Sequence, residues 1–511
     1  MTSVPRPLVP TIGGSVNASQ SRNEHLAAIA CWSDVSGASF TVVGLGKSGI
    51  AAANALCQRG ADVLCIDDVP ESKLGSALAA LDRRAQVHCG QTSGPVGRRG
   101  DIFILSPGVM PHSARFRDVQ ALATAILSEI ELFYRLDRAD NDGLGHPIVA
   151  ISGTDGKTTT TLWVAHMLAT AGLPVVVGGN IGEPLCGFLG KLGRNTVVVA
   201  EVSAFQLHTC SLFRPRSAVV TNVAADHVDW FAGDFDAYVA TKVKVAAQLG
   251  VGDAFAINGD DPQLQPHRQA LTAASFSWQV FSVQAVPARG FGFDGDTLWW
   301  ALAAETKVPL ATAAELGCEG KHPIVGLHNV ENALAASALA LGMAVPLAAI
   351  RQGLRTFSLP SHRIEPVAAI GQVRFVDDSK ATNPHAAIAG LQAMQLAAGE
   401  KLVWIAGGSE KDADFVELGQ VAGQLVDAAI LIGQTQDRIA GCLPATLAIH
   451  RVATLQEAAP LGLQLAGTAG IVLLSPACAS FDMFNGYAHR GEVFAAAVVA
   501  LKAAIDRQSS L

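Results

Sequence analysis

The sequence predicts an α/β protein with three domains: a Rossmann-like N-terminal domain, a central P-loop ATPase-like domain with a mainly parallel sheet, and a Rossmann-like C-terminal domain. Short apolar runs alternate with Ala- and Leu-rich helical stretches along most of the chain, as in successive βαβ units. Two polar breaks, at residues 137–143 and 358–361, divide this alternation. We therefore expect a loose N-terminal extension over residues 1–38 and domains over residues 39–140, 141–358 and 359–511.

The composition is that of a folded protein, since half of the residues are hydrophobic and only 16% are charged. The net charge is −8 and the basic residues are scattered, which argues against a nucleic-acid-binding surface. No apolar run approaches the ~18 residues of a membrane-spanning helix, and the N-terminus lacks the features of a signal peptide. The nine cysteines form no Cys-x-x-Cys pair, as expected for reduced thiols. We expect a cytoplasmic protein without membrane insertion.

The first domain begins with an apolar run at residues 40–43, and a glycine-rich turn follows it directly. That turn, Gly44-Leu45-Gly46-Lys47-Ser48-Gly49, has GxGxxG spacing, and the next strand-like run ends in Asp67-Asp68. This pattern is typical of a dinucleotide site in which a carboxylate contacts the ribose. A tight strand-to-helix turn without a ligand has the same pattern. A third run, residues 102–105, leads into Ser106-Pro107-Gly108 at the sheet edge where ligands bind.

The central domain contains the most informative motif, Gly153-Thr154-Asp155-Gly156-Lys157-Thr158. An apolar run, residues 147–151, precedes it, and a helical stretch follows it. A strand, a glycine loop and a helix in this order form a phosphate cradle, in which backbone N–H groups and Lys157 meet the anion and Thr158 can bind Mg²⁺. The Walker spacing is imperfect, because Ile151 stands where the first glycine belongs. A glycine turn with an exposed lysine is the alternative interpretation.

Carboxylates follow two further apolar runs of this domain. Glu201 comes directly after residues 197–200, and Asp226-His227-Val228-Asp229 follows the run at 218–220. Carboxylate oxygens suit Mg²⁺, which a nucleoside-triphosphate site needs to neutralise phosphoryl charge, whereas histidine is a less usual ligand. The alternative is that Asp226 caps a helix and that His227 is an interior histidine.

The third domain has four strand-like apolar runs, at residues 373–376, 402–405, 429–432 and 471–474. We find no internal repeat that relates the domains to one another.

Several motifs occur in the same order as in the Mur ligases, the ATP-dependent amide-forming enzymes of peptidoglycan precursor synthesis. They are residues 153–158, Glu201-Val202-Ser203-Ala204-Phe205-Gln206-Leu207, residues 226–229 and Gly326-Leu327-His328-Asn329-Val330-Glu331-Asn332. The resemblance extends over all three domains, from residue 40 to residue 494. Within the family, Asp378-Ser379-Lys380-Ala381-Thr382-Asn383 and Ser475-Pro476-Ala477-Cys478-Ala479-Ser480 resemble the member that adds D-glutamate.

The resemblance implies an ATP-dependent ligase that joins D-glutamate to UDP-MurNAc-L-Ala through an acyl phosphate and releases ADP and phosphate. It also implies two Mg²⁺ ions beside ATP and two small-molecule substrates, and we expect a monomer. The first domain would bind UDP rather than NAD. The third domain would carry the amino-acid site and close over the phosphates to exclude water.

The family's site residues carry over position by position. The catalytic residues would be Lys157, His227, Lys242 and Lys380, and the metal ligands would be Thr158, Glu201, His227 and Lys242. ATP would contact Gly153, Thr154, Asp155, Gly156, Lys157, Thr158, Thr159, Asn329, Asn332, Arg363 and Asp378. The UDP substrate would contact Gly44, Gly46, Lys47, Ser48, Asp67, Ser106, Pro107, Gly108 and Asn180. Glutamate would contact Thr382, Lys411, Ser480, Phe481 and Tyr487.

Lys242 matches the family's lysine that reacts with CO₂ to give a carbamate, which is a further anionic ligand for Mg²⁺. Carbamylation needs the neutral amine, and burial favours that form by lowering the lysine pKa. A surface lysine is the alternative from residue type alone.

Some features depart from the family pattern. Asp155 stands where Asn is usual, Ala204 replaces a second Ser, Tyr487 occupies a position often held by Phe, and residues 1–38 have no counterpart. Three other functions compete with the ligase. A nicotinamide-dependent oxidoreductase explains the Gly44 turn but not the phosphate loop. A folylpolyglutamate synthase-like ligase shares the ATP site but does not explain the nucleotide-binding loop of the first domain. A non-enzymatic scaffold does not explain why the catalytic residues are all present.

Overall fold

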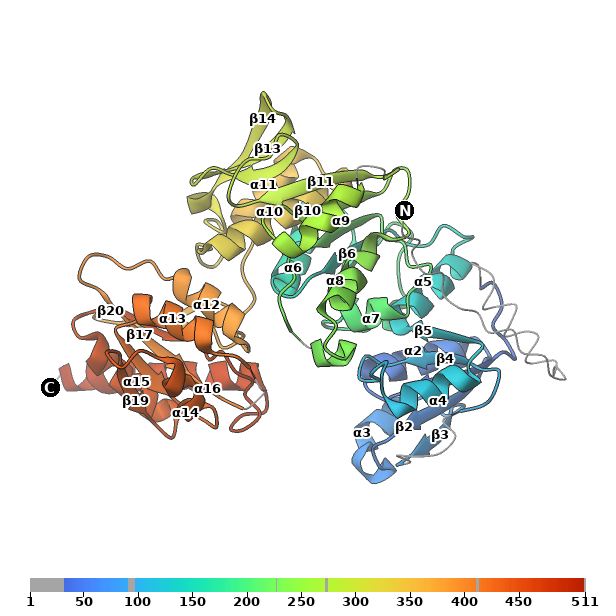
Figure 1. Cartoon of the computed structure of the whole chain (residues 1–511), viewed down its shortest axis with the longest axis horizontal. Coiled ribbons are helices and arrows are strands. Elements are labelled where there is room, and N and C mark those ends of the chain that lie inside the picture. The colour runs from blue at the N-terminus through green and yellow to red at the C-terminus, as the bar shows by residue number, and fades with distance from the viewer. Residues whose placement is uncertain (1–31, 91–96, 227, 272–273, 410–412, 510–511) are drawn as a thin grey trace. The chain divides into compact units, whose positions relative to one another are not determined.

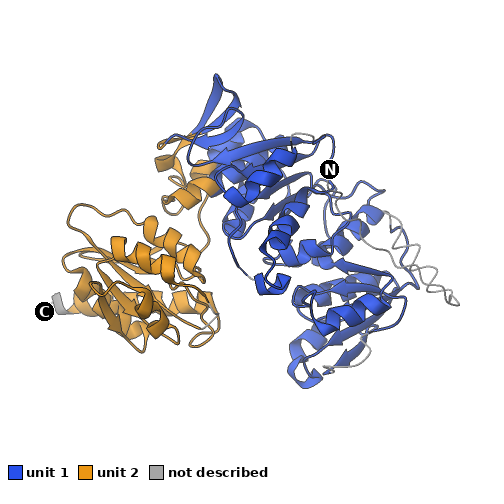
Figure 2. Ribbon diagram, in the orientation of Figure 1, with its two compact units in different colours: residues 1–294, 299–310, 332–353 blue, residues 295–298, 311–331, 354–511 orange. Residues whose placement is uncertain are grey.

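The computed structural model describes residues 32–90, 97–226, 228–271, 274–409 and 413–509. The predicted site residues His227 and Lys411 lie outside these ranges. Three sheets with accompanying helices make up the described chain (Figure 1), so the α/β class is confirmed. The chain divides into two compact units (Figure 2). One comprises residues 1–294, 299–310 and 332–353, and the other comprises residues 295–298, 311–331 and 354–511.

The first sheet has five parallel strands in the order β3-β2-β1-β4-β5. The strands β1 and β4 bury every residue, as expected of parallel strands that are covered on both faces. The elements are β1 (Ser39–Val43), α2 (Lys47–Gln58), β2 (Asp62–Asp67), α3 (Gly75–Ala80), β3 (Gln86–Cys89), β4 (Ile102–Leu105), α4 (Ala114–Leu122), β5 (Ala125–Ser128) and α5 (Glu129–Asp140).

Residues 32–38, which the sequence analysis assigned to a loose extension, pack onto this first domain. Trp32 and Val35 are each only 2% exposed. The Trp32 ring lies 5.8 Å from the Phe40 ring, and the Arg135 guanidinium lies 5.1 Å from the centre of the Trp32 ring. A single tryptophan can anchor a short segment because it buries a large apolar area, and the polar composition around it concealed this contact.

The central sheet has nine strands in the order β14-β13-β12-β11-β10-β9-β6-β8-β7. The strand β6 lies between β8 and β9 and is parallel to both, so the loops after these three strands meet at one sheet edge. The main elements are β6 (Ile148–Ser152), α6 (Lys157–Thr170), β7 (Val175–Gly179), β8 (Val197–Glu201), α7 (Ala204–His208), β9 (Ser217–Val220), α8 (Phe235–Val243), β10 (Ala254–Asn258), α9 (Gln265–Ala270), β11 (Ser277–Ser282), β12 (Gly290–Phe293), β13 (Thr297–Ala303), β14 (Thr306–Thr312), α10 (Leu327–Gly342) and α11 (Leu347–Thr356).

The third sheet has six strands in the order β15-β16-β20-β17-β18-β19. Only the pair β15–β16 is antiparallel, and the remaining neighbours are parallel. The elements are β15 (Glu365–Ile370), β16 (Gln372–Asp377), α12 (Pro384–Gln392), β17 (Lys401–Ala406), α13 (Val416–Leu425), β18 (Ala428–Leu431), α14 (Gln436–Cys442), β19 (Ala448–Arg451), α15 (Leu455–Ala466), β20 (Ala469–Leu474) and α16 (Tyr487–Ser509).

The polar break at residues 137–143 is partly helical, because α5 continues to Asp140. Asp137 is only 4% exposed, and its carboxylate accepts hydrogen bonds from the backbone N–H and the Nδ1 of His146, each at 2.6 Å. Hydrogen bonds of Asp137 therefore fix the chain just before β6. No helix within the described residues is long and apolar enough to cross a membrane.

Candidate active site

A glycine loop joins β6 to α6 and leaves the helix N-terminus open to a ligand. Gly153 has a φ of 139° and Gly156 a φ of 76°, conformations that L side chains disfavour. A Cβ on Gly153 would lie 1.9 Å from Thr221 Oγ1, and a Cβ on Gly156 would lie 2.1 Å from Asn332 Oδ1. Gly156 is the N-cap residue and supplies no side chain to the first N–H groups of α6. Those N–H groups are therefore suited to bind an anion.

The segment after β9 holds this loop in place. The Asn222 Oδ1 accepts a hydrogen bond from the backbone N–H of Asp155 at 2.8 Å, and the Thr221 hydroxyl donates to the Asp155 carbonyl at 2.7 Å. The Thr154 hydroxyl lies 3.3 Å from the Tyr238 hydroxyl. Thr221, Asn222 and Tyr238 were not among the predicted site residues. The signal for the first two was their position, directly after a strand that neighbours β6.

Four predicted residues come together at the start of α6. The Lys157 Nζ donates to the Thr154 carbonyl at 2.6 Å. The Thr158 hydroxyl donates to Glu201 Oε2, and Asn180 Nδ2 donates to Glu201 Oε1, both at 2.8 Å. Glu201 is only 2% exposed. A hydroxyl beside a buried carboxylate offers two oxygen ligands of the kind that Mg²⁺ prefers, so this donor set fits that ion.

Lys242 lies inside the domain and not on its surface, because its side chain is only 3% exposed. Its Nζ donates to the Gly153 carbonyl at 2.6 Å and lies 4.4 Å from the centre of the Tyr238 ring. Burial lowers the pKa of Lys242 well below its ordinary value, and the nearby Lys157 charge lowers it further. Asp226, Asp155 and Glu201 act in the opposite direction. A buried lysine with a lowered pKa has more neutral amine at physiological pH than a surface lysine has.

The structure also gives the surroundings of three other residues that were predicted to contact ATP. The Asn332 Oδ1 accepts a hydrogen bond from the Thr160 hydroxyl at 3.2 Å and faces Gly156 of the loop. The Asn329 Nδ2 donates to the Val325 carbonyl at 2.7 Å, within the N-terminal turn of α10. The Thr159 side chain is only 2% exposed on α6, so its backbone N–H is the group that the open helix end could present.

The first-domain turn is also built around glycines. Gly44 has a φ of 93°, and a Cβ there would lie 2.7 Å from the Ser106 Cβ, while a Cβ on Gly49 would lie 1.9 Å from the Gly44 carbonyl oxygen. The Ser106 hydroxyl donates to the Gly44 carbonyl at 2.9 Å. Asp67 accepts hydrogen bonds from the backbone N–H groups of Leu45 at 2.6 Å and of Val69 at 2.8 Å. The turn, Asp67 and Ser106 therefore form one hydrogen-bonded group, with Lys47 exposed at the start of α2.

An aromatic cluster connects residues 106–108 of the first domain with the phosphate loop. The Trp230 Nε1 donates to the Pro107 carbonyl at 3.2 Å. The Trp230 ring lies 4.8 Å from the Phe231 ring, which lies 5.3 Å from the Tyr238 ring beneath Lys242. His208 packs edge-on against Trp230 at 5.2 Å, and its burial lowers the His208 pKa to about 4, so it is neutral here. This cluster was not predicted, since its members are scattered along the chain.

The second unit contains the buried carboxyl group of Asp378, directly after β16. The Ser475 hydroxyl donates to Asp378 Oδ2 at 2.7 Å, and Gly390 leaves room for this oxygen, because a Cβ there would lie 2.5 Å from it. Burial raises the pKa of Asp378 to about 7, although the nearby Arg363 charge opposes that rise. The predicted pair Arg363 and Asp378 is therefore close enough to interact electrostatically.

The residues that were predicted to bind the substrate glutamate differ in their exposure to solvent. The Lys380 Nζ lies 3.9 Å from the centre of the Tyr487 ring, and Tyr487 is 36% exposed. Ser480 is buried, Phe481 is 73% exposed, and Thr382 is half-buried.

Arg490, which the sequence analysis did not identify, ties two of the predicted motifs together. Its side chain is fully buried and donates to the Ser379 hydroxyl at 3.0 Å, the Ser379 carbonyl at 2.8 Å and the Cys478 carbonyl at 3.0 Å. It therefore connects the segment after β16 with the segment after β20. A lone arginine on a helix gives no sequence signal for such a role.

Comparisons with known proteins agree with this geometry. The profile "Mur ligase MurD-like, N-terminal domain" matches residues 38–128, "Mur ligase middle domain" matches 151–340, and "Mur ligase, glutamate ligase domain" matches 362–478. The UDP-N-acetylmuramoylalanine–D-glutamate ligase of Pelotomaculum thermopropionicum is 36% identical over 467 residues, which are 90% of this chain and 97% of that protein. The chain belongs to the Mur ligase family.

Further relatives of this Mur ligase agree. The ligase of the same name from Nitrosospira multiformis is 36% identical over 485 residues, covering 92% of this chain and 97% of that protein. Among solved structures, the UDP-N-acetylmuramate-alanine ligase of Thermotoga maritima has a TM-score of 0.54 at 19% identity, covering 93% of this chain and all of that chain. A second ligase from that organism, solved with ADP, has a TM-score of 0.54 at 15% identity, covering 79% and 96%. These structures confirm the fold class, and the family assignment confirms the resemblance.

Proposed function

We propose that this Mur ligase joins D-glutamate to UDP-MurNAc-L-Ala with ATP, in peptidoglycan precursor synthesis, and that it acts as a monomer. The relatives that are 36% identical over about 90% of the chain carry the substrate assignment. The observation that carries the ATP chemistry is the glycine loop with Lys157, Thr158 and Glu201 gathered at the open end of α6. In the reaction, the substrate carboxylate attacks the γ-phosphate and ADP leaves. The glutamate amine then attacks the acyl phosphate, and phosphate leaves as the amide forms.

The main barrier to the reaction is the repulsion between the substrate carboxylate and the triphosphate, and the residues of the phosphate loop lower it. The open N–H groups of α6 and the Lys157 ammonium bind the phosphate oxygens and offset their negative charge. Thr158 and Glu201 would hold one Mg²⁺, which supplies charge neutralisation at the transferring phosphoryl group. Asn180 orients Glu201 by its hydrogen bond to Oε1. His227 remains a proposed ligand of a second Mg²⁺.

We propose that Lys242 is carbamylated in the active enzyme. The buried position and the lowered pKa of Lys242 support this, because only the neutral amine adds CO₂. The product is an anion beside the phosphate loop, in a region where Lys157 provides a complementary charge. The carbamate N–H would still be able to donate to the Gly153 carbonyl, as the amine does here at 2.6 Å.

The remaining assignments follow the domains. We propose that the Gly44 turn with Gly46, Lys47, Ser48, Asp67 and residues 106–108 binds the UDP part, with Asn180 near the muramoyl part. We propose that Asn329, Asn332, Arg363 and Asp378 contribute to the ATP site. Thr382, Lys411, Ser480, Phe481 and Tyr487 would bind glutamate, with Lys380 beside them. Hydroxyl and ammonium donors suit the two carboxylates of that substrate.

Phosphate release with UDP-MurNAc-L-Ala, ATP and Mg²⁺ tests the substrate assignment directly. We expect release only when D-glutamate is added, and not with L-glutamate, L-alanine, a diamino acid or a D-alanine dipeptide. Mass spectrometry should find the glutamyl product in the same samples. Release that depends on L-alanine or on the diamino acid would place the chain at another step of the family.

A second prediction concerns Trp230. Trp230→Phe keeps an aromatic ring in the cluster but removes the donor to the Pro107 carbonyl. Since one hydrogen bond contributes about 1 kcal/mol, we expect the KM for the UDP substrate to rise roughly fivefold, with the KM for ATP nearly unchanged. Trp299→Phe is a matched control, because it removes an indole donor to Asp294, away from the loops. An equal rise of both KM values would show that Trp230 acts on the whole unit and not on residues 106–108.

A further inference from the structure

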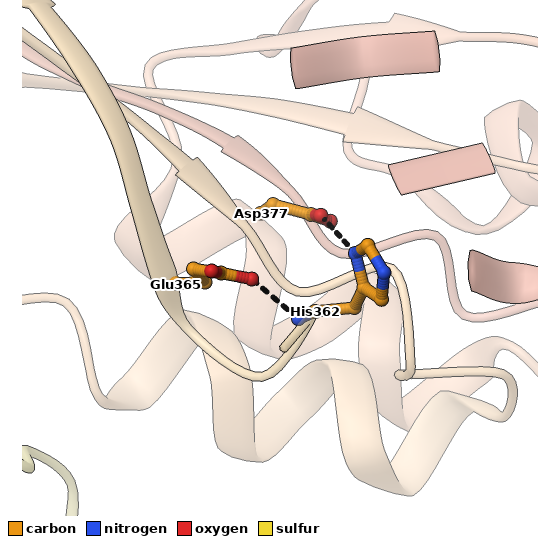
Figure 3. A group of neighbouring side chains, drawn as sticks. All are labelled: His362, Glu365 and Asp377. Atoms are coloured by element: carbon orange, nitrogen blue, oxygen red, sulfur yellow. Dashed lines mark hydrogen bonds and ion pairs between the residues drawn. The ribbon is translucent and has the colours of Figure 1, made fainter. Parts of the chain in front are cut away.

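Three titratable residues meet at the start of the strand pair β15–β16 (Figure 3). His362 lies in the turn before β15, Glu365 is the first residue of β15, and Asp377 is the last residue of β16. The Nδ1 of His362 lies 2.7 Å from Asp377 Oδ2, and the backbone N–H of His362 donates to Glu365 Oε2 at 2.7 Å. The second oxygen of Asp377 accepts the backbone N–H of Ser379 at 2.8 Å. Asp377 is only 2% exposed. We assign the proton of this pair to His362 Nδ1, because an ionised carboxylate only accepts hydrogen bonds.

These side chains could be taken for a cation site, since one ligand atom from each lies within 4.8 Å of the others. The structure argues against that interpretation. The His362 Nδ1 and both oxygens of Asp377 already have hydrogen-bond partners. Helix α16 also closes the space, because a Cβ on Gly491 would lie 2.2 Å from His362 Nδ1 and 2.4 Å from Asp377 Oδ2. The group is a hydrogen-bonded brace.

The brace holds a backbone conformation that residues other than glycine adopt only at a cost. His362 has a φ of 67° and Ile364 has a φ of 49°. The left-handed region is unfavourable for L residues, and most of all for a β-branched side chain such as that of Ile364. Such a conformation persists only when surrounding contacts determine it, and it often occurs at functional sites. Here the contacts include those of His362 with Asp377 and Glu365, and a hydrogen bond from the Ile364 backbone N–H to the Asp378 carboxyl group.

The strained turn contains one proposed active-site residue, Arg363, and contacts another, Lys380. Arg363 is its central residue, and its charge influences the pKa of Asp378. The His362 carbonyl accepts the backbone N–H of Lys380 at 3.1 Å. The His362 ring also lies 6.2 Å from the Tyr487 ring, over which the Lys380 Nζ is placed at 3.9 Å. One residue thus contacts the backbone of Lys380 and the aromatic ring beneath its ammonium group.

We propose that His362 is a positioning residue: through Asp377 it holds the left-handed turn that presents Arg363 and fixes the backbone of Lys380. This inference rests on the proposed nucleotide role of Arg363 and the proposed catalytic role of Lys380. Nothing in it requires His362 to exchange a proton with substrate.

His362→Asn and His362→Ala separate positioning from proton transfer. Asparagine adopts left-handed backbone more readily than most residues, and its Nδ2 is the same number of bonds from Cα as the Nδ1 of histidine. We expect His362→Asn to keep kcat/KM within about threefold of wild type. We expect His362→Ala to lose about tenfold or more, the scale of one hydrogen bond to a charged group, with higher KM values for both ATP and glutamate. If His362→Asn is as impaired as His362→Ala, the positioning role is wrong and general acid–base catalysis by His362 is favoured.

Hydrogen exchange gives a readout that needs no substrate. The amide of Lys380 should exchange faster in His362→Ala than in wild type or His362→Asn. Gly491→Ala should have the same effect, since its Cβ displaces the brace, and Gly441→Ala on α14, which has open space at Cβ, is the matched control. If His362→Ala does not fold, His362→Gln replaces it, because its amide is one bond too long. Unchanged exchange in these variants overturns the inference, whereas wild-type protein without glutamate-dependent phosphate release would overturn only the proposed function.

Discussion

Lys157→Ala is expected to abolish ATP-dependent phosphate release while leaving the binding of the UDP substrate intact. Lys157 is the first residue of α6, and its ammonium places a positive charge at the phosphate loop. Removing one preorganised donor from a developing negative charge typically costs ~100- to 1,000-fold in rate, and here a full charge is lost as well. Initial-rate measurements of phosphate release should therefore fall to background.

The separation of the two ligand sites makes this prediction specific. The Gly44 turn belongs to the five-stranded sheet, whereas Lys157 follows β6 of the nine-stranded sheet. Calorimetric titration with UDP-MurNAc-L-Ala should therefore give a Kd close to that of wild type. Lys502→Ala, at an exposed position of α16, is the matched control. Loss of UDP-substrate binding in a folded Lys157→Ala protein would contradict the assignment of separate sites.

Lys242→Ala and Lys242→Arg are both expected to lose most activity without losing the fold. Alanine removes the group that would become a carbamate, and arginine keeps a positive charge but does not form one, because its guanidinium stays protonated. Arginine could still donate to the Gly153 carbonyl, so it separates the carbamate role from simple anchoring of the loop. Near-normal activity of Lys242→Arg would rule out the carbamate and leave the anchoring role.

Wild-type activity should also depend on CO₂ and pH in a defined direction. Burial lowers the pKa of Lys242, so a larger share of its amine is neutral and reactive at a given pH than in a surface lysine, and that share falls as the pH falls. Thorough removal of CO₂ at mildly acidic pH should reduce activity, and bicarbonate at neutral pH should restore it. Labelled bicarbonate should give a carbamate carbon signal by NMR in the wild type and none in Lys242→Arg.

Much of this architecture could be predicted because it depends on local patterns. The strands that the sequence analysis named are present as β1, β2, β4, β6, β8, β9, β16, β17, β18 and β20. Central parallel strands are covered on both faces, so they appear as continuous apolar runs. The strands β3, β5, β7, β10, β11, β12, β13, β14, β15 and β19 were not named; of these, the edge strands β3 and β19 carry polar residues. The antiparallel pair β15–β16 was also not anticipated.

The chemistry of the site could be predicted only in part. The residue types of the phosphate loop and the position of Glu201 after a strand were sufficient to predict a phosphate and metal site. The Thr158–Glu201–Asn180 contacts confirm that these residues meet, although they are separated by up to 43 positions along the chain. Parallel strands bring their carboxyl ends to one edge, which is why position after a strand is informative.

The sequence by itself determined the fold class, the glycine loops and the family, since these depend on the order and type of neighbouring residues. Only the tertiary structure decided the burial of Lys242, the aromatic link through Trp230, the buried Arg490 and the His362–Asp377 brace. Each of these depends on contacts between residues that are distant in the chain. A lysine or histidine carries no local mark of whether it will be solvated or desolvated, because burial is set by the elements that pack around it.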